Sequence, residues 1–140
     1  MRVMLFSHEG YGLGHVARTA KAANILCGAH TCLVVTCQRE VSWLLDPACD
    51  FVKLPSFDHC FKDRSEHREV QSAAFTHIED PRGFLSSQAK GLVSAFEPDL
   101  ILVDHIPSGT RGYLYETIAG TACRKALLMR PVLGNLEESM

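Results

Sequence analysis

Short apolar segments alternate along this chain with segments of helical periodicity. The first apolar run, Val3 to Phe6, precedes an Ala-rich helical pattern that stops near Gly28, and a β-branched run follows from Thr31 to Cys37. Similar alternation predicts further strands at 51–54, 100–103 and 124–129, and helices at 39–45, 81–96 and 113–119. Strands that alternate with crossover helices form parallel sheets. The sequence therefore predicts an α/β fold with a Rossmann-like, doubly wound parallel sheet.

A glycine-rich segment from Gly10 to His15 joins the first predicted strand to the first predicted helix. Glycines allow a sharp turn and the close approach of a ligand, and the free N–H groups of a helix start favour negative charge. His15 is placed at this helix mouth, where a titratable imidazole suits chemistry better than packing. Its structural interpretation is a helix cap or a hydrogen bond to the backbone.

Asp104 ends the predicted strand at 100–103. In open α/β sheets the ligand crevice lies at the carboxyl ends of the strands, where the strand order reverses, and we expect the first strand and this strand to be neighbours there. His15 and Asp104 would then meet. A carboxylate bound to one imidazole nitrogen fixes the tautomer and leaves the other nitrogen as a general base. The alternative is that Asp104 only caps the following turn.

Charge and N-terminal composition exclude several classes of partner. The 140 residues include 14 Lys and Arg against 16 Asp and Glu, for a formal charge of −2, without a basic cluster. We therefore expect neither nucleic acid nor an anionic membrane surface as a partner. The first apolar run is far too short for a signal peptide or a membrane span, which predicts a cytoplasmic protein. The length of 140 residues predicts one domain over residues 1–140.

Cysteines and histidines are numerous but not spaced as metal ligands. The six cysteines include no C-x-x-C pair and are interpreted as reduced, small apolar residues. No metal site is predicted from the other candidate ligands, because none of their spacings matches a helix-borne or knuckle-type site; they are His8, His59, His67, His77, His105 and Cys60. The charged run from Asp58 to Glu69 is interpreted as a solvated loop, or alternatively as a flap that contacts a substrate.

Three motifs together resemble a known family. They are Gly-x-Gly-His-x-x-Arg at residues 12–18, Phe-Val-Lys-Leu-Pro-Ser-Phe at 51–57, and Glu-Pro-Asp-Leu-Ile-Leu-Val-Asp at 97–104 with Pro107 and Gly109 beyond. In this combination the chain, from Met1 to about Gly134, resembles the N-terminal, acceptor-side domain of GT-B glycosyltransferases. It is most similar to bacterial predicted glycosyltransferases related to the murein precursor transferase.

The resemblance implies transfer of a sugar from a nucleotide-sugar donor to an acceptor hydroxyl, with no cofactor. The acceptor would be a small molecule, a glycan or a lipid-linked substrate, and the enzyme would be of the hexosyl- or N-acetylhexosaminyltransferase type. His15 and Asp104 match the family's catalytic base and its partner. The positions that match its substrate-binding motifs are Gly12, Gly14, Arg18, Pro107 and Gly109.

The family's donor-binding C-terminal domain has no counterpart in these residues, and the first domain itself is shorter than usual. The resemblance thus implies a truncated product or one half of a split enzyme, inactive without a donor-binding domain or partner chain.

Two other functions are compatible with the sequence. Gly12 to Ala17 also fits the G-x-G-x-x-[G/A] dinucleotide fingerprint, and Arg39 could bind a 2′-phosphate, which would make the chain an NAD(P)-binding domain. Against this, Ser7 to Tyr11 intervene between the strand and the fingerprint. The chain could also be a non-catalytic subunit that serves a partner carrying the donor site.

Overall fold

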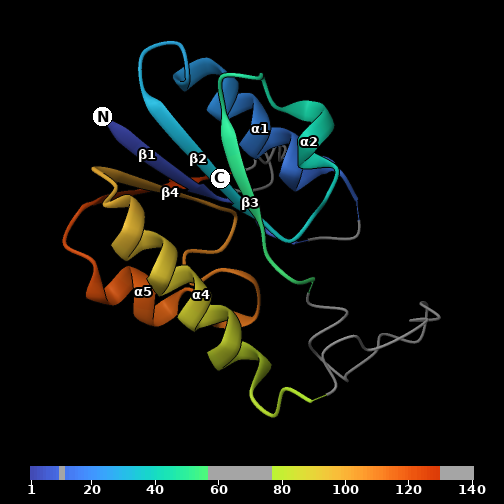
Figure 1. Cartoon of the computed structure of the whole chain (residues 1–140), viewed down its shortest axis with the longest axis vertical. Coiled ribbons are helices and arrows are strands. Elements are labelled where there is room, and N and C mark those ends of the chain that lie inside the picture. The colour runs from blue at the N-terminus through green and yellow to red at the C-terminus, as the bar shows by residue number, and fades with distance from the viewer. Residues whose placement is uncertain (10–11, 57–76, 130–140) are drawn as a thin grey trace, which may run out of the picture.

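A five-stranded parallel sheet forms the centre of the protein (Figure 1). The computed structural model describes residues 1–9, 12–56 and 77–129. The strands are β1 (Arg2–Phe6), β2 (Thr31–Thr36), β3 (Asp50–Lys53), β4 (Leu100–Asp104) and β5 (Arg124–Leu128). Their order in the sheet is β3-β2-β1-β4-β5, and every neighbouring pair is parallel. The order reverses between β1 and β4, so the predicted Rossmann-like α/β fold and the predicted pairing of these two strands are both confirmed.

Helices cover the two faces of the sheet (Figure 1). One face carries α1 (Gly14–Leu26) and the short α2 (Val41–Leu44). The other carries α4 (Pro81–Phe96) and α5 (Tyr115–Gly120). Asp80 caps α4 by accepting a hydrogen bond from the Gly83 backbone N–H, and Pro81 occupies the first turn, where its missing N–H costs nothing.

The strands are apolar throughout because each face is covered. Successive side chains of a strand point to opposite faces. Val3 and Leu5 of β1 therefore pack in the core beneath α1, whereas Met4 and Phe6 pack in the core beneath α4. All four are essentially inaccessible to solvent. An uninterrupted apolar run is thus what a buried parallel strand requires.

The segment before α5 differs from the prediction. The sequence predicts a helix from residue 113, but Tyr113 and Leu114 precede α5 and follow a 3₁₀ turn, η1 (Thr110–Gly112). Gly109 and Gly112 have φ angles of 72° and 78°, which reverse the chain so that both apolar side chains become fully buried. Tyr113 and Leu114 therefore pack in the core at the end of this turn and do not lengthen α5.

The outer strand β5 pairs only with β4 among the described strands, and its residues are largely exposed.

Of the described cysteines, Cys32, Cys37 and Cys49 are buried, and the five described thiols form no disulfide. Several sequence predictions lie outside the described residues: the charged run at 58–69, Phe57, and the candidate ligands His59, Cys60 and His67.

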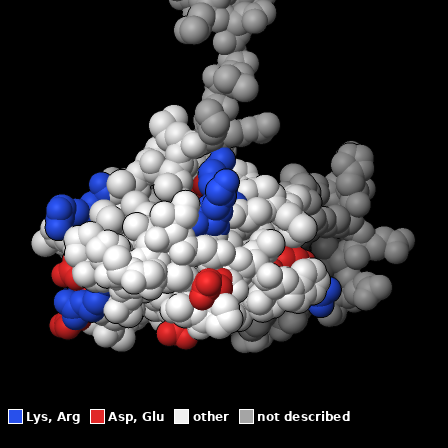
Figure 2. Space-filling model, turned by 90° about the horizontal axis from the view of Figure 1, so that it is seen from above, with Lys and Arg blue, Asp and Glu red and all other residues white. Residues whose placement is uncertain are grey.

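Charges are dispersed on the face shown in Figure 2, where basic and acidic side chains stand as separate groups among uncharged residues. One exposed ion pair joins Arg2 to Glu97, and another joins Lys90 to Glu116. Within the described residues, none of the helices combines the length and the apolar character that a bilayer span demands.

We predict that Gly109→Ala destabilises the fold. A Cβ at Gly109 would lie 2.7 Å from Leu114 Cγ, and its φ of 72° is unfavourable for alanine. The expected loss in the free energy of unfolding is about 1–3 kcal/mol, measured by urea denaturation. Gly91→Ala is the matched control, because Gly91 lies inside α4 with open space around it, and it should stabilise the fold by about 0.5–1 kcal/mol. Equal stability of the Gly109 variant and the parent would contradict the packing role.

Candidate functional site

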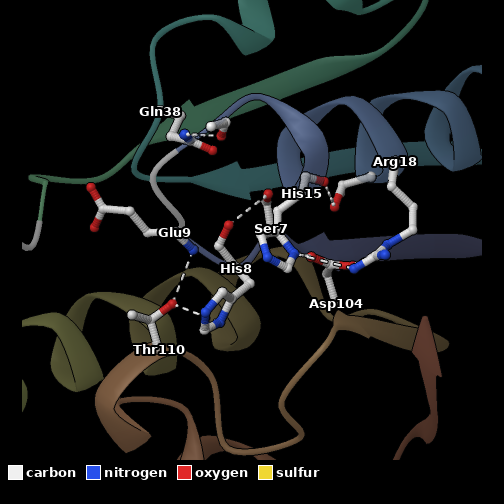
Figure 3. A network of polar contacts seen from close by, with 10 residues as sticks. Ser7, His8, Glu9, His15, Arg18, Gln38, Asp104 and Thr110 are labelled. Atoms are coloured by element: carbon white, nitrogen blue, oxygen red, sulfur yellow. Dashed lines mark hydrogen bonds and ion pairs between the residues drawn. The ribbon is translucent and has the colours of Figure 1, made fainter. Parts of the chain in front are cut away.

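A polar cluster lies at the carboxyl ends of β1 and β4, at the point where the strand order reverses (Figure 3). His15 is the second residue of α1, and Asp104 is the last residue of β4. His15 Nδ1 lies 2.7 Å from Asp104 Oδ2. The predicted meeting of these two side chains is therefore found, although residues 15 and 104 are far apart in the chain.

Arg18 is the third member of the cluster. Its Nε donates to Asp104 Oδ1 at 2.6 Å, and its Nη2 lies 2.5 Å from the same oxygen. Asp104 is fully buried, whereas His15 and Arg18 keep about a quarter of their side chains exposed. A buried carboxylate needs hydrogen bonds and a compensating charge, and Arg18 supplies both. The resemblance implies substrate binding for Arg18, but its guanidinium is engaged with Asp104.

These contacts determine where the proton of neutral His15 lies. Arg18 can only donate hydrogen bonds, and its Nη2 lies 3.2 Å from His15 Nδ1. The shorter contact is to Asp104, whose carboxylate can only accept while it is ionised against Arg18. His15 Nδ1 therefore carries the proton and donates it to Asp104. Nε2 is then the basic nitrogen of the neutral ring.

Two further histidines surround His15. The rings of His8 and His105 have their centroids 4.8 Å and 5.0 Å from that of His15, and 5.0 Å from each other. One ring nitrogen from each residue lies within 4.8 Å of the others, so the three side chains could together hold a metal ion. Sequence spacing predicts no metal site here, and that expectation stays a prediction.

His8 is neutral near physiological pH. Its pKa is lowered to about 4, first by burial and then by the neighbouring His15, His105 and Arg18, against the opposing effect of Asp104. Its Nδ1 lies 3.0 Å from Thr110 Oγ1, which also accepts a hydrogen bond from the Glu9 backbone N–H (Figure 3). The contact fixes the His8 ring against the loop that follows β4.

His105 has a φ of 69°, which is unfavourable for a residue with a Cβ. The Ile106 N–H bonds to the Asp104 carbonyl across it, and the His105 N–H bonds to Leu128. These hydrogen bonds hold a tight turn directly after β4. Strained non-glycine residues of this kind concentrate at functional sites.

The glycines predicted to bind substrate occupy different environments. A Cβ added to Gly12 or Gly14 would meet no described atom within 4 Å, and neither has a positive φ. The expectation that these glycines allow a sharp turn stays a prediction, since part of the segment lies outside the described residues, and the open space beside Gly12 and Gly14 suits a close approach of a ligand. Gly109 is buried against Leu114, and Pro107 is exposed in the same loop.

The described residues form two surface hollows away from this cluster. Two surface hollows of about 620 and 530 Å³ run along α4 and α5. Neither is lined by His15, Arg18 or Asp104. Among the described residues, His15 and Arg18 remain partly exposed at this edge of the sheet.

Sequence reasoning missed the role of Arg18 and the grouping of His8 and His105. His15 and Arg18 are three residues apart on a predicted helix, a spacing that places them on one face. His8 and His105 follow the carboxyl ends of two strands predicted to be neighbours. The three-residue spacing and the two positions after strands are visible in the sequence, but neither is a local ligand motif. Only the sheet order shows that these side chains lie together.

The class defined by this fold and site is an α/β, Rossmann-like domain that resembles a glycosyltransferase domain. Among solved structures, Phytolacca americana UGT2, complexed with UDP-2fluoro-glucose and pterostilbene, matches with a TM-score of 0.60 and 14% identity. The match covers 91% of this chain and 30% of that one, so the chain spans less than a third of the plant protein's length. At this identity the likeness concerns the fold.

A second solved structure, the C-terminal domain of a hydrogenase from Pyrococcus furiosus, matches at 14% identity with a TM-score of 0.49. It covers 91% of this chain and 90% of that one. Because the TM-score is below 0.5, no argument rests on it. No protein-family model matches this chain, and no curated protein matches it.

We predict strong energetic coupling between Arg18 and Asp104. Arg18→Met removes the cationic partner of the buried Asp104 carboxylate and should cost about 2–4 kcal/mol in the free energy of unfolding. The double variant with Asp104→Leu should cost less than the sum of the two single variants by about 1–3 kcal/mol. Urea denaturation measures all three.

Arg2→Met is the matched control, because the Arg2–Glu97 pair is exposed and should contribute at most about 1 kcal/mol. Additive effects of the Arg18 and Asp104 variants would show that the ion pair does not stabilise the cluster.

Proposed function

We propose that this chain is the acceptor-side part of a GT-B type glycosyltransferase, in which His15 removes the proton from an acceptor hydroxyl. The observation that carries the proposal is the 2.7 Å contact between His15 Nδ1 and Asp104 Oδ2 at the carboxyl ends of β1 and β4. This contact makes Nε2 the basic nitrogen. The glycosyltransferase-like fold supports the same assignment.

The proposed reaction uses His15 as a general base. The acceptor oxygen attacks the anomeric carbon of the donor sugar as its proton passes to His15 Nε2, and the bond from that carbon to the nucleotide phosphate breaks. The nucleoside diphosphate leaves with the bonding electron pair. Asp104 stabilises the imidazolium that forms, and Arg18 acts as a positioning residue that keeps Asp104 ionised and oriented.

Open space beside Gly12 and Gly14 supports an acceptor position next to His15. Both residues lie at or before the start of α1, and an added Cβ there would meet no described atom. A ligand could therefore approach the backbone within a few ångströms of the base. The acceptor is proposed to be a small molecule, a glycan or a lipid-linked substrate.

The donor site is proposed to lie in a second doubly wound domain or a partner chain. The cluster is partly exposed, and the surface hollows lie elsewhere, along α4 and α5. An added domain would exclude water from the reacting atoms. The finer proposal of a hexosyl- or N-acetylhexosaminyltransferase related to the murein precursor enzymes rests on the sequence resemblance alone, and the proposed cytoplasmic location rests on sequence composition.

We predict that His15→Ala lowers the rate of transfer by a factor of about 10²–10⁴, the usual effect of losing a general base. The assay combines the chain with its donor-binding domain or partner chain and measures release of nucleoside diphosphate. Asp104→Asn should cost less than His15→Ala, because it removes a charge from the orienting group but leaves the base in place.

His30→Ala is the control, because His30 lies beside the N-terminal amine, away from the cluster. Added imidazole should partly restore the His15→Ala variant and should not affect the control. Near-normal turnover by His15→Ala would remove His15 from the mechanism. Equal rates for Asp104→Asn and the parent would exclude the proposed pair.

A further inference from the structure

His8, His15 and His105 converge on one small volume from three separate segments. His8 follows β1, His15 lies in the first turn of α1, and His105 follows β4. One ring nitrogen from each lies within 4.8 Å of the others. The sugar-transfer proposal uses only His15, so the positions of His8 and His105 need another explanation.

The distal nitrogens of two of these rings are already oriented by oxygen atoms. His15 Nδ1 donates a hydrogen bond to Asp104, and His8 Nδ1 lies 3.0 Å from Thr110 Oγ1, whose second lone pair can accept a hydrogen bond from it. Each ring would therefore bind a metal through Nε2. Histidine ligands of metals characteristically bond through their other nitrogen to a carboxylate, a carbonyl or a similar acceptor, which fixes the tautomer.

The separations fit a metal after a small adjustment. Tetrahedral zinc with Zn–N bonds of about 2.0–2.1 Å requires nitrogens roughly 3.3 Å apart, so ring nitrogens that lie within 4.8 Å of one another must approach by at most about 1.5 Å. His105 is exposed and can supply this movement by side-chain rotation. Its strained φ of 69° already places its ring beside the other two.

The charge balance also suits a cation. The Arg18 guanidinium lies beside His15, and its charge is compensated by Asp104. Three neutral imidazoles are the usual ligands of zinc and similar divalent transition metals. By contrast, hard cations such as Mg²⁺ prefer oxygen ligands, which this cluster does not offer at its centre.

We propose that His8, His15 and His105 form a binding site for a divalent transition metal such as Zn²⁺, with Asp104 and Thr110 orienting the ligands and a fourth position open. The inference does not rest on the sugar-transfer proposal. A bound metal would occupy His15 Nε2, the nitrogen that the transfer reaction needs as a base. Metal binding and base catalysis at this residue would therefore exclude each other.

The test is a titration of the metal-free chain with Co²⁺, followed by visible absorption, in a reductant that does not bind metals. The expected result is one equivalent of bound Co²⁺ with d–d bands but without thiolate-to-cobalt charge transfer. His105→Ala and His8→Ala should each weaken binding at least tenfold, and Asp104→Asn by about 10–100-fold. His30→Ala should bind as the parent does.

His105 is exposed, so its variant is expected to fold, which circular dichroism verifies for every variant. Unchanged Co²⁺ affinity in His105→Ala would overturn the proposal. Binding accompanied by thiolate charge transfer would also overturn it, by assigning the metal to cysteines. Since no sugar transfer is measured, an inactive transferase assay would leave this result unaffected, and failure of metal binding would leave His15 available as a base.

Discussion

The buried carboxylate of Asp104 is the constraint around which this end of the molecule is organised. It is fully inaccessible to solvent, and an isolated buried charge is strongly unfavourable. Arg18 compensates the charge, and His15 takes up the second oxygen. Both partners lie on α1, so the same interaction that satisfies Asp104 also holds the first turns of α1 against the end of β4. The geometry of the site is thereby linked to the stability of the fold.

The sheet order makes that interaction available. β1 is central, with β2 on one side and β4 on the other, and the helices that follow β1 and β4 cover opposite faces. Connections leaving neighbouring strands toward opposite faces separate at the carboxyl edge, which is where α/β proteins bind ligands. His8, His15 and His105 all come from these two connections. Their grouping is a consequence of the topology and not of any local motif.

His15 Nε2 is the atom on which both proposed chemistries depend. As a free base it would accept a proton from a hydroxyl, and as a metal ligand it would share its lone pair with a cation. Asp104 serves either role in the same way, since a carboxylate that accepts a hydrogen bond from Nδ1 fixes the tautomer and the direction of Nε2. The separate readouts, turnover for one and cobalt spectra for the other, distinguish them because His8 and His105 matter only to the second.

The sequence by itself determined the α/β class, because apolar periodicity is a local property. The neighbouring position of β1 and β4, and with it the meeting of His15 and Asp104, was expected only from the usual arrangement of strands in such sheets. The sequence placed Tyr113 in a helix, since periodicity does not reveal that Gly109 and Gly112 reverse the chain. Only the tertiary structure decided that Arg18 binds Asp104 and that three histidines meet. Those contacts join residues about 90 positions apart, and only the packing of β1, α1 and β4 brings them within bonding distance.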